Sequence, residues 1–483
     1  MSNNILKKIL QFSILAILVS FLKLSPTIAA TYCIDATDGN DSNDGLSTSS
    51  AWKTIAKVNS SSFQPGDYIL FKKGEIWREQ LNIPSSGIEG NPITFGAYGV
   101  GDKPAISGGS ERDYAVLIAN KRYIVIDGIK CSNSLHGAIT IGGISDNITV
   151  QNCIMTGSRH GIAIYDNAGG DNIIQNNLIY DLTGNGINAN PHTGSTSGSE
   201  TIIKGNVIYN AFDFGMFCRV NYWIIEDNEI YNCGHNTELG VECVGILIYS
   251  ASADDDTGRH NVIRRNKING IVSAGYEGSG IECDRWCNNN KVYYNVCFNN
   301  DGPGITLYDA ANNEVYGNTC YGNCKNSSGE LGKKGEIRLS SSISDLNKNN
   351  KVKNNIAYAI RPSVYALYID SSTSDNEIDL DSNCWYSTNE NWYFWNGAGS
   401  SNLEKWNGLS VVGADLYTDP NMVNPANENF QLRGSSRCID AGTNVGITKD
   451  FLGNNVPQGV GVDIGAFEYQ IIKPPTNIHI IYP

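Results

Sequence analysis

The stretch IIQNNLIY at residues 173–180 decides the fold, because the chain repeats it with small changes. Further copies are IIKGNVIY (202–209), IIEDNEIY (224–231), VIRRNKIN (262–269), VYYNVCF (292–298), VYGNTCY (315–321) and VKNNIAY (352–358). Each copy contains one Asn at the same position, and these Asn residues follow one another at intervals of 29, 22, 38, 29, 23 and 37 residues. A unit of about 22 residues cannot bury a core of its own and must stack on its neighbours. The longer intervals indicate loops inserted into a regular stack.

The repeated Asn is suited to a turn between two short strands. Asn tolerates the left-handed backbone conformation, and its amide can hydrogen-bond to the same amide one coil away. A helical solenoid would need longer periodic runs with few Gly and Asn residues. The repeat therefore predicts an all-β parallel β-helix, with a ladder of asparagines from Asn177 to Asn355.

A second strand in each coil starts near a glycine, as in GITLY at Gly304. Alternation of period two predicts a column of side chains that points into the core. It consists of Ile139, Ile162, Ile187, Met216, Ile246, Ile281, Ile305, Ile337 and Leu367. The same register turns Cys218 and Cys283 inward, and Cys297 and Cys320 match in successive coils. Buried, reduced cysteines are therefore favoured over a disulfide network for most of the 13 cysteines.

Both ends of the chain differ from the repeat. Residues 1–30 contain two early lysines, an apolar run from Ile9 to Leu22 and small residues up to Ala30, a pattern typical of a signal peptide. We expect a protein that is secreted or held at the cell surface. After the signal peptide, the sequence predicts a cap with irregular first coils at 31–121, the β-helix repeats at 122–386, a closing region at 387–472 and a tail at 473–483. The cap is expected to include a short helix at 51–58.

The charge of the chain narrows the range of partners. The formal net charge is -14, and removal of the signal peptide, with three lysines and no acids, changes it to -17. Such a charge repels nucleic acid and anionic membrane surfaces. We therefore expect no nucleic-acid partner and no membrane insertion, and we expect a monomer. A neutral glycan is mildly favoured as ligand, unless calcium bridges an anionic one.

Three segments resemble bacterial right-handed parallel β-helix repeat proteins with the pectin-lyase-like fold. They are YCIDATDGNDSNDGLSTSSAWKTIAKVNSSSFQPGD (Tyr32 to Asp67), the coils from Tyr123 to Tyr386, and CIDAGTNVGITKDFLGNNVPQGVGVDIGAFEY (Cys438 to Tyr469), the last similar to the C-terminal region of anchor-type members. The resemblance implies a single-stranded, right-handed solenoid with a short N-terminal capping helix. This fold carries lyases, hydrolases, epimerases and proteins without known chemistry, so the site must decide the activity.

Two carboxylates stand out among the outward positions of the Gly-led strands. Glu282 and Asp284 project from the same side of one strand, about 7 Å apart. That separation falls within the roughly 6.5–9.5 Å of an inverting glycosidase pair. Tyr249 and Tyr308 are expected on either side of Asp284, where their rings could stack on a sugar. A purely structural alternative is that both carboxylates form ion pairs with neighbouring arginines.

Arg219 supports a different mechanism, in which it acts as the base that removes the proton beside a uronate carboxylate while calcium neutralises that carboxylate. Oxygen ligands for Ca²⁺ could come from the next insertion, at Asp254, Asp255 and Asp256, although a run of three Asp is also typical of a solvated loop. Epimerisation is disfavoured, because Asn190 and Thr193 replace both acids of the Asp-Pro-His-Asp motif of epimerases with this fold.

The predicted substrate-binding residues line the outward columns or their ends. They are Tyr165, His192, Tyr249, Arg285, Tyr308, Asp309 and Arg338. The leading hypothesis is an enzyme that cleaves an extracellular polysaccharide in a groove on the β-helix, either as a glycoside hydrolase or as a polysaccharide lyase. The alternatives are a non-catalytic carbohydrate-binding or adhesin-type solenoid and a component of a surface layer or matrix.

Overall fold

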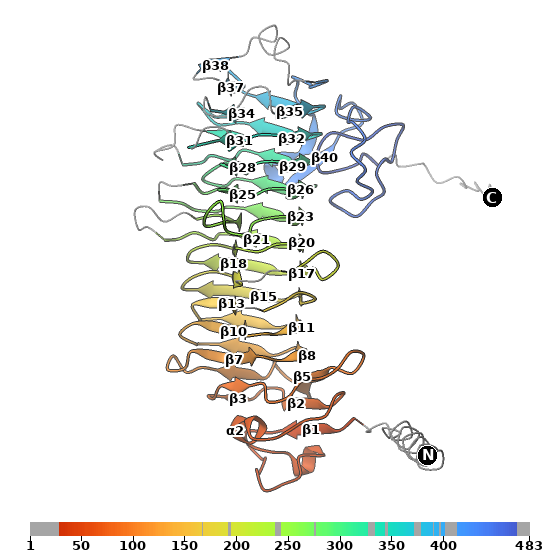
Figure 1. Ribbon diagram of the computed structural model, residues 1–483. Coiled ribbons are helices and arrows are strands. Elements are labelled where there is room, and N and C mark those ends of the chain that lie inside the picture. The colour runs from red at the N-terminus through yellow and green to blue at the C-terminus, as the bar shows by residue number, and fades with distance from the viewer. Residues whose placement is uncertain are drawn as a thin grey trace, which may run out of the picture.

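The structure is a computed structural model that describes residues 29–470, except 167, 192–194, 237–242, 275–276, 327–333, 343–345, 371–377, 390, 396–397 and 401–412. Most of the predicted signal peptide and the predicted tail lie outside these residues. Three long parallel sheets run through the molecule, and their strands alternate along the chain. Figure 1 shows the coils stacked in sequence order into an elongated solenoid. The predicted parallel β-helix is confirmed.

Each regular coil gives one strand to each sheet. Sheet A contains β1 (Thr31–Ile34), β2 (Tyr68–Lys72), β5 (Ile93–Tyr98), β8 (Arg122–Asp127), β11 (Asp146–Gln151), β14 (Ile173–Gln175), β17 (Thr201–Lys204), β20 (Trp223–Glu226), β23 (Val262–Arg264), β26 (Lys291–Tyr293), β29 (Glu314–Tyr316), β32 (Asn350–Lys353) and β35 (Ile378–Asp381). Sheet B contains β3 (Ile76–Trp77), β6 (Ala105–Ser107), β9 (Lys130–Ser132), β12 (Ile154–Thr156), β15 (Leu178–Leu182), β18 (Val207–Ala211), β21 (Glu229–Tyr231), β24 (Lys267–Asn269), β27 (Val296–Phe298), β30 (Thr319–Tyr321), β33 (Ile356–Ala359) and β36 (Cys384–Ser387).

Sheet C carries the Gly-led strands of the sequence pattern. It contains β4 (Leu81–Asn82), β7 (Tyr114–Ala119), β10 (Gly137–Gly142), β13 (His160–Asp166), β16 (Ile187–Pro191), β19 (Met216–Cys218), β22 (Ile246–Ile248), β25 (Ile281–Asp284), β28 (Ile305–Tyr308), β31 (Gly335–Ser340), β34 (Tyr365–Ile369), β37 (Tyr393–Trp395) and β38 (Ala398–Ser400). All nine residues of the predicted inward column are buried without exposed surface. Cys218, Cys283, Cys297 and Cys320 are equally buried and are reduced thiols.

The predicted asparagine ladder joins sheets A and B at each coil. The Nδ2 of each Asn donates to the Oδ1 of the Asn one coil further on, at 2.9–3.0 Å from Asn177 through Asn355. The ladder continues to Asn383 and ends on the carboxylate of Asp415. These bonds satisfy polar groups inside the turn, where burial would otherwise make them costly.

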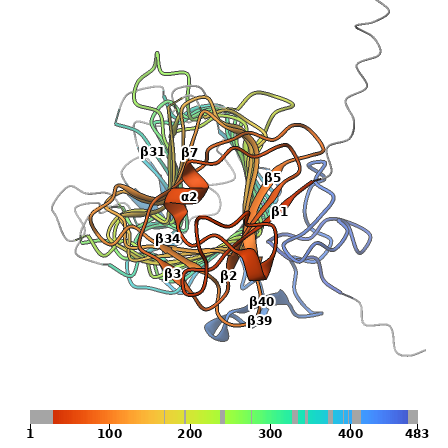
Figure 2. The same cartoon turned by 90° about the horizontal axis from the view of Figure 1, so that it is seen from below.

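The N-terminal helix is shorter than predicted. It is α2 (Ile55–Asn59) rather than residues 51–58, because the Oγ1 of Thr54 accepts a hydrogen bond from the N–H of Lys57 and caps the helix there. Trp52 instead forms a parallel bridge with Ile34. Seen along the solenoid, α2 lies across the end of the stack (Figure 2), as the predicted capping role requires.

The stack continues beyond residue 386, where the repeat was expected to end. In sheet C, Tyr368 of β34 is in register with Phe394 of β37, and β38 then pairs with β37 in the antiparallel sense. The following segment, from residue 413, returns along the outside of the solenoid and includes β39 (Met422–Asn424) and β40 (Asn429–Leu432), as Figures 1 and 2 show. No helix in the described ranges is both long and apolar enough to cross a membrane.

Candidate functional site

The outward columns of sheet C have the register that the sequence pattern predicts. Leu247 of β22 pairs with Glu282 of β25, which pairs with Thr306 of β28, which pairs with Arg338 of β31. Each partner therefore lies one strand spacing, about 4.8 Å, from the next. A second column places Asp284 beside Tyr308 and Ser340. The two carboxylates thus leave the same strand on the side away from the core.

The exposure of these residues differs from that of an open surface groove. Glu282 has no exposed surface, Asp284 is 3% exposed, and Arg338 is 1% exposed. A polar side chain removed from water to this extent needs interactions within the fold or with a ligand. Between the two carboxylates, Cys283 points inward, and its burial raises the pKa of its thiol to about 12.

Two guanidinium groups approach the ring of Tyr308. The Cζ atom of Arg285 lies 5.9 Å from the ring centroid, and the Cζ atom of Arg338 lies 5.7 Å from it. The Nε of Arg338 also donates to the Oγ of Ser340 at 2.9 Å. Because cations favour the face of an aromatic ring, these contacts hold both guanidinium groups at Tyr308, the residue in register with Asp284. The structure therefore brings the predicted residues Asp284, Tyr308, Arg285 and Arg338 together.

Arg219 has an acidic partner of its own. Its Nε donates to the Oδ2 of Asp255 at 2.8 Å, and its Nη1 reaches the Oδ1 of Asn190 at 3.4 Å. Burial tends to raise the pKa of Asp255, but hydrogen bonds from Arg219, the N–H of Ala251 and Thr257 outweigh it, and the net effect lowers this pKa. The pair is therefore ionised, which is typical of a fixed cation rather than of a group that accepts a proton.

The three consecutive aspartates do not form the calcium site considered from the sequence. Asp255 is bound to Arg219, whereas Asp256 is paired with Arg259 at 2.9 Å and Asp254 is exposed. Within the part of the chain that the structure describes, no three His, Cys, Asp or Glu side chains are arranged to hold a metal ion. This loop uses its carboxylates to neutralise two arginines.

The other predicted binding residues have varied surroundings. Tyr165 is half-buried, and its hydroxyl accepts a hydrogen bond from the Nδ2 of Asn188 at 2.9 Å. Asp309 is buried, and its carboxylate accepts hydrogen bonds from Ser341 and Ser342. Asp309 therefore fixes the turn after β31, and its contact with a substrate stays a prediction. His192 lies outside the described residues.

On the N-terminal side of the carboxylates, the predicted residue Tyr249 belongs to an aromatic cluster with two phenylalanines that were not predicted as site residues. The ring of Phe217 lies 5.8 Å from that of Tyr249 and 5.5 Å from that of Phe214, all three being partly exposed. Phe217 precedes Leu247 in the same column as Glu282, so the period-two pattern contained the signal for it. Aromatic rings beside polar groups are common in sites that bind sugars and other small molecules.

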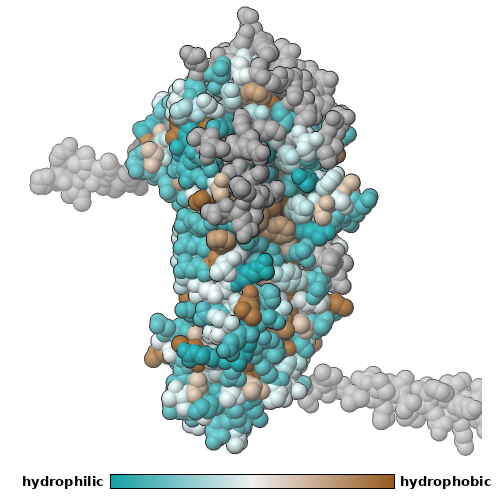
Figure 3. Space-filling model, turned by 90° about the vertical axis from the view of Figure 1, so that its left-hand side faces the viewer, coloured by the Kyte–Doolittle hydropathy of each residue, from teal (hydrophilic) through white to brown (hydrophobic). Residues whose placement is uncertain are grey.

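The surface on this side of the molecule is mainly polar. Figure 3 shows the side that faces left in Figure 1, and its coloured surface is mostly hydrophilic, with apolar residues in small separate groups. A broad apolar patch would instead indicate a lipid or protein contact. The visible surface is suited to a hydrated ligand.

Comparison with known proteins supports the fold. Residues 102–257 match the family model described as a right handed beta helix region. The right-handed parallel β-helix, and with it the resemblance to proteins of the pectin-lyase-like fold, is thereby confirmed.

Individual relatives are similar over different parts of the chain. A lacto-N-biosidase from Bifidobacterium longum subsp. longum is 35% identical over 104 residues, which are 19% of this chain and 6% of that protein. The crystal structure of a GH136 lacto-N-biosidase from Eubacterium ramulus has a TM-score of 0.54 at 15% identity and covers 72% of this chain and 66% of its own. A structure of XylC with xylose has a TM-score of 0.53 at 13% identity, and the match covers 90% of this chain and 98% of XylC. At such identities the two structures show a shared fold alone.

Proposed function

We propose that this protein is a secreted carbohydrate-active enzyme that hydrolyses a glycosidic bond at Glu282 and Asp284. The observation that carries the proposal is the placement of two buried carboxylates on one strand, with two arginines and a tyrosine beside them. The local similarity to a lacto-N-biosidase, 35% identical over 104 residues, supports a glycoside hydrolase over a lyase.

The neighbours of the two carboxylates suit different roles in an inverting hydrolysis. Glu282 has no exposed surface and stands between Leu247 and Thr306 in its column, and in this proposal it carries the catalytic proton. We assign it as the general acid, which donates that proton to the glycosidic oxygen as the bond from this oxygen to the anomeric carbon breaks. Asp284 is in register with Tyr308, whose ring centroid lies 5.9 and 5.7 Å from the guanidinium groups of Arg285 and Arg338, and we assign it as the general base. It accepts a proton from the water that attacks the anomeric carbon.

The sugars on either side of the cleaved bond have distinct surroundings in this proposal. Phe217 and Tyr249 provide ring faces toward the N-terminal coils, where a pyranose can stack. Arg285 and Arg338 lie on the side of Asp284 that faces the C-terminal coils. The Arg219–Asp255 pair contributes fixed polar groups at the edge of the site. Elimination at a uronate is the competing reaction, and it needs a group that accepts a proton. Arg219 is poorly suited to that role because it is ion-paired with Asp255.

The test is incubation of the purified mature protein with neutral oligosaccharides, including ones that contain lacto-N-biose, and with uronic polysaccharides. Each reaction is run with calcium and with a chelator. New reducing ends without unsaturated products, equally in both conditions, are expected for the proposed hydrolysis. Unsaturated products would identify a lyase and contradict the assignment. Retained glycan binding without any product would favour a non-catalytic binding protein instead.

A further inference from the structure

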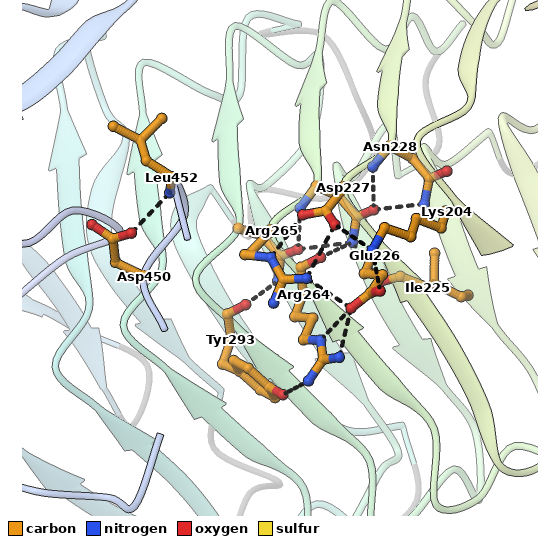
Figure 4. Close-up of polar contacts among 12 residues, drawn as sticks. Lys204, Ile225, Glu226, Asp227, Asn228, Arg264, Arg265, Tyr293, Asp450 and Leu452 are labelled. Carbon is orange, nitrogen blue, oxygen red and sulfur yellow. Dashed lines mark hydrogen bonds and ion pairs between the residues drawn. The ribbon is translucent and has the colours of Figure 1, made fainter. Parts of the chain in front are cut away.

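A second feature of the molecule lies on the outer face of sheet A, away from the carboxylates of sheet C. A cleft of about 690 Å³ opens between this face and residues 445–453 of the returning C-terminal segment. Its floor is made of outward side chains of β17, β20, β23, β26 and β29, and Figure 4 shows its polar centre. We call this feature the sheet A cleft.

The sheet A cleft has an excess of positive charge in an otherwise acidic protein. Its basic lining residues are Lys204, Arg264, Arg265, Lys291 and Lys449. Its acidic lining residues are Glu226, Asp227 and Glu314. Five cations against three anions leave two positive charges in excess, whereas the whole chain has a net charge of -14. A cleft whose net charge is opposite in sign to that of the whole molecule raises the local concentration of anions.

Ion pairs fix the arginines on the floor of the cleft. Glu226, whose side chain is 8% exposed, accepts hydrogen bonds from the Nε of Arg264 at 2.6 Å and the Nη2 of Arg265 at 2.7 Å. Arg265 also binds Asp227 at 2.7 Å, and Arg264 donates to the hydroxyl of Tyr293 at 2.8 Å. Figure 4 shows this network lying on adjacent strands. Because the guanidinium groups are already held, a ligand would lose little free energy in ordering them.

The wall of the cleft adds apolar surface and one cation, but no exposed carboxylate. Asp450, the acidic residue of the wall, is fully buried and accepts hydrogen bonds from the N–H groups of Leu452 and Glu468. Figure 4 shows the bond from Leu452. Val445 and Ile447 pack against the tyrosine cluster that includes Tyr293. The wall therefore offers contacts for a sugar ring without repelling an anion.

We propose that the sheet A cleft binds an acidic oligosaccharide, with Lys204 and Lys291 contacting its carboxylates. Both lysine side chains stay accessible, at 47% and 56% exposure, although Lys204 has two acidic neighbours within 4 Å and Lys291 has one. The inference takes from the proposed function only that the protein meets glycans, and it is independent of the chemistry at Glu282 and Asp284. The cleft would hold the enzyme on an acidic glycan while sheet C acts on its own substrate.

The experiment is calorimetric titration of the full-length mature protein with a uronic acid hexasaccharide, a neutral hexasaccharide and inorganic sulfate. The key variants are Lys291→Gln and the double variant Lys204→Gln/Lys291→Gln. The matched control is Arg122→Gln, which removes a cation that is also on sheet A, is also 56% exposed and also has a single acidic neighbour. Loss of a charge-assisted contact is expected to weaken uronate binding about tenfold in Lys291→Gln and further in the double variant.

The control and the neutral probe decide between outcomes. We expect Arg122→Gln to bind the uronate with an affinity within twofold of wild type. We also expect the double variant to cleave a neutral substrate at the wild-type rate. Equal losses in Arg122→Gln and Lys291→Gln would show a diffuse charge effect and overturn the proposal. If the neutral hexasaccharide binds as tightly as the uronic one, the proposed contact of the lysines with carboxylates is wrong. If sulfate alone binds as tightly as the uronic hexasaccharide, the cleft is not a site for a saccharide.

Discussion

One buried residue at a ladder turn, Glu336, is expected to make the free energy of unfolding depend on pH. A further ladder runs from Asn300 to Asn323 and ends on Glu336, whose carboxylate accepts hydrogen bonds from the N–H and Nδ2 of Asn323. Glu336 has no exposed surface, and this burial raises its pKa to about 8. The folded protein therefore retains a proton that the unfolded chain releases at much lower pH.

The sign of this effect gives a prediction for Glu336→Gln. A carboxyl group with a raised folded-state pKa stabilises the fold fully below about pH 4.5, and that contribution is lost as the pH rises through about 8. The wild type is expected to lose stability over this window by a few kcal/mol more than Glu336→Gln, because Gln keeps an acceptor but does not ionise. Denaturant unfolding between pH 4.5 and 9 measures the difference.

The control for this prediction is Glu229→Gln, on the partly exposed face of sheet B, where Glu229 pairs with Lys267. This variant should follow the wild-type pH dependence. Parallel stability curves for the wild type and Glu336→Gln would mean that Glu336 is not the group that titrates.

At the scale of the element, the turns show what the sequence pattern could predict and what it could not. The pattern correctly predicts the ladder and the register of sheet C, since both depend on spacing within each coil. A third amide ladder, from Asn261 through Asn290 and Asn313 to Asn350, was not predicted. Its signal was present, because Asn290 and Asn295, like Asn313 and Asn318, are five residues apart.

Other local features depend on contacts that spacing does not encode. The capping helix starts at Ile55 because of the side chain of Thr54, which a hydrophobic pattern does not reveal. The burial of Glu282 and Arg338, at 0% and 1% exposure, is not encoded in the alternation of the strands, which marks both positions as outward. The role of Asp309 follows from the turn at Ser341 and Ser342, which lies one coil further on.

The ladder predicts a large loss of stability on removal of one amide. In Asn318→Ala, the N–H and Nδ2 of Asn295 lose their acceptor, and the carbonyl of Val292 loses a donor. Leaving these buried groups unpaired is expected to cost about 3 kcal/mol of unfolding free energy. Equilibrium denaturation measures this loss, with Asn269→Ala, on a partly exposed strand position, as the control. Equal stability of the two variants would contradict a structural role for the ladder.

At the scale of the whole molecule, the returning C-terminal segment covers coils that lie far away in the sequence. Phe430 of β40 is 2% exposed and packs against Phe298 and Tyr321 of sheet B, with ring centroids 5.1 and 5.6 Å away. The side-chain amide of Asn354 also binds the backbone of Thr443, because its Nδ2 donates to the carbonyl oxygen and its Oδ1 accepts from the N–H. No repeat marks this segment, so its path could not be predicted from the sequence.

Phe430→Ala tests how this segment is held. The lost packing is expected to cost about 3 kcal/mol, mainly in the docking of residues 413–470. Limited proteolysis read by mass spectrometry should then show faster cleavage within this segment, while the β-sheet circular dichroism signal is retained. Phe212→Ala, at a residue that is 41% exposed, is the control and should be cleaved like the wild type. Wild-type resistance in Phe430→Ala would show that this contact does not hold the segment.

The central claim is that the outward face of sheet C cleaves glycosidic bonds through Glu282 and Asp284. The most direct measurement is kcat on the oligosaccharide that the wild type hydrolyses, compared among Glu282→Gln, Asp284→Asn and the control Glu229→Gln. Loss of a general acid or base is expected to lower kcat by about 10²–10⁴-fold in the first two variants. Glu229→Gln should keep the wild-type value. Activity within a few-fold of wild type in Glu282→Gln and Asp284→Asn, with both variants folded, would contradict the account.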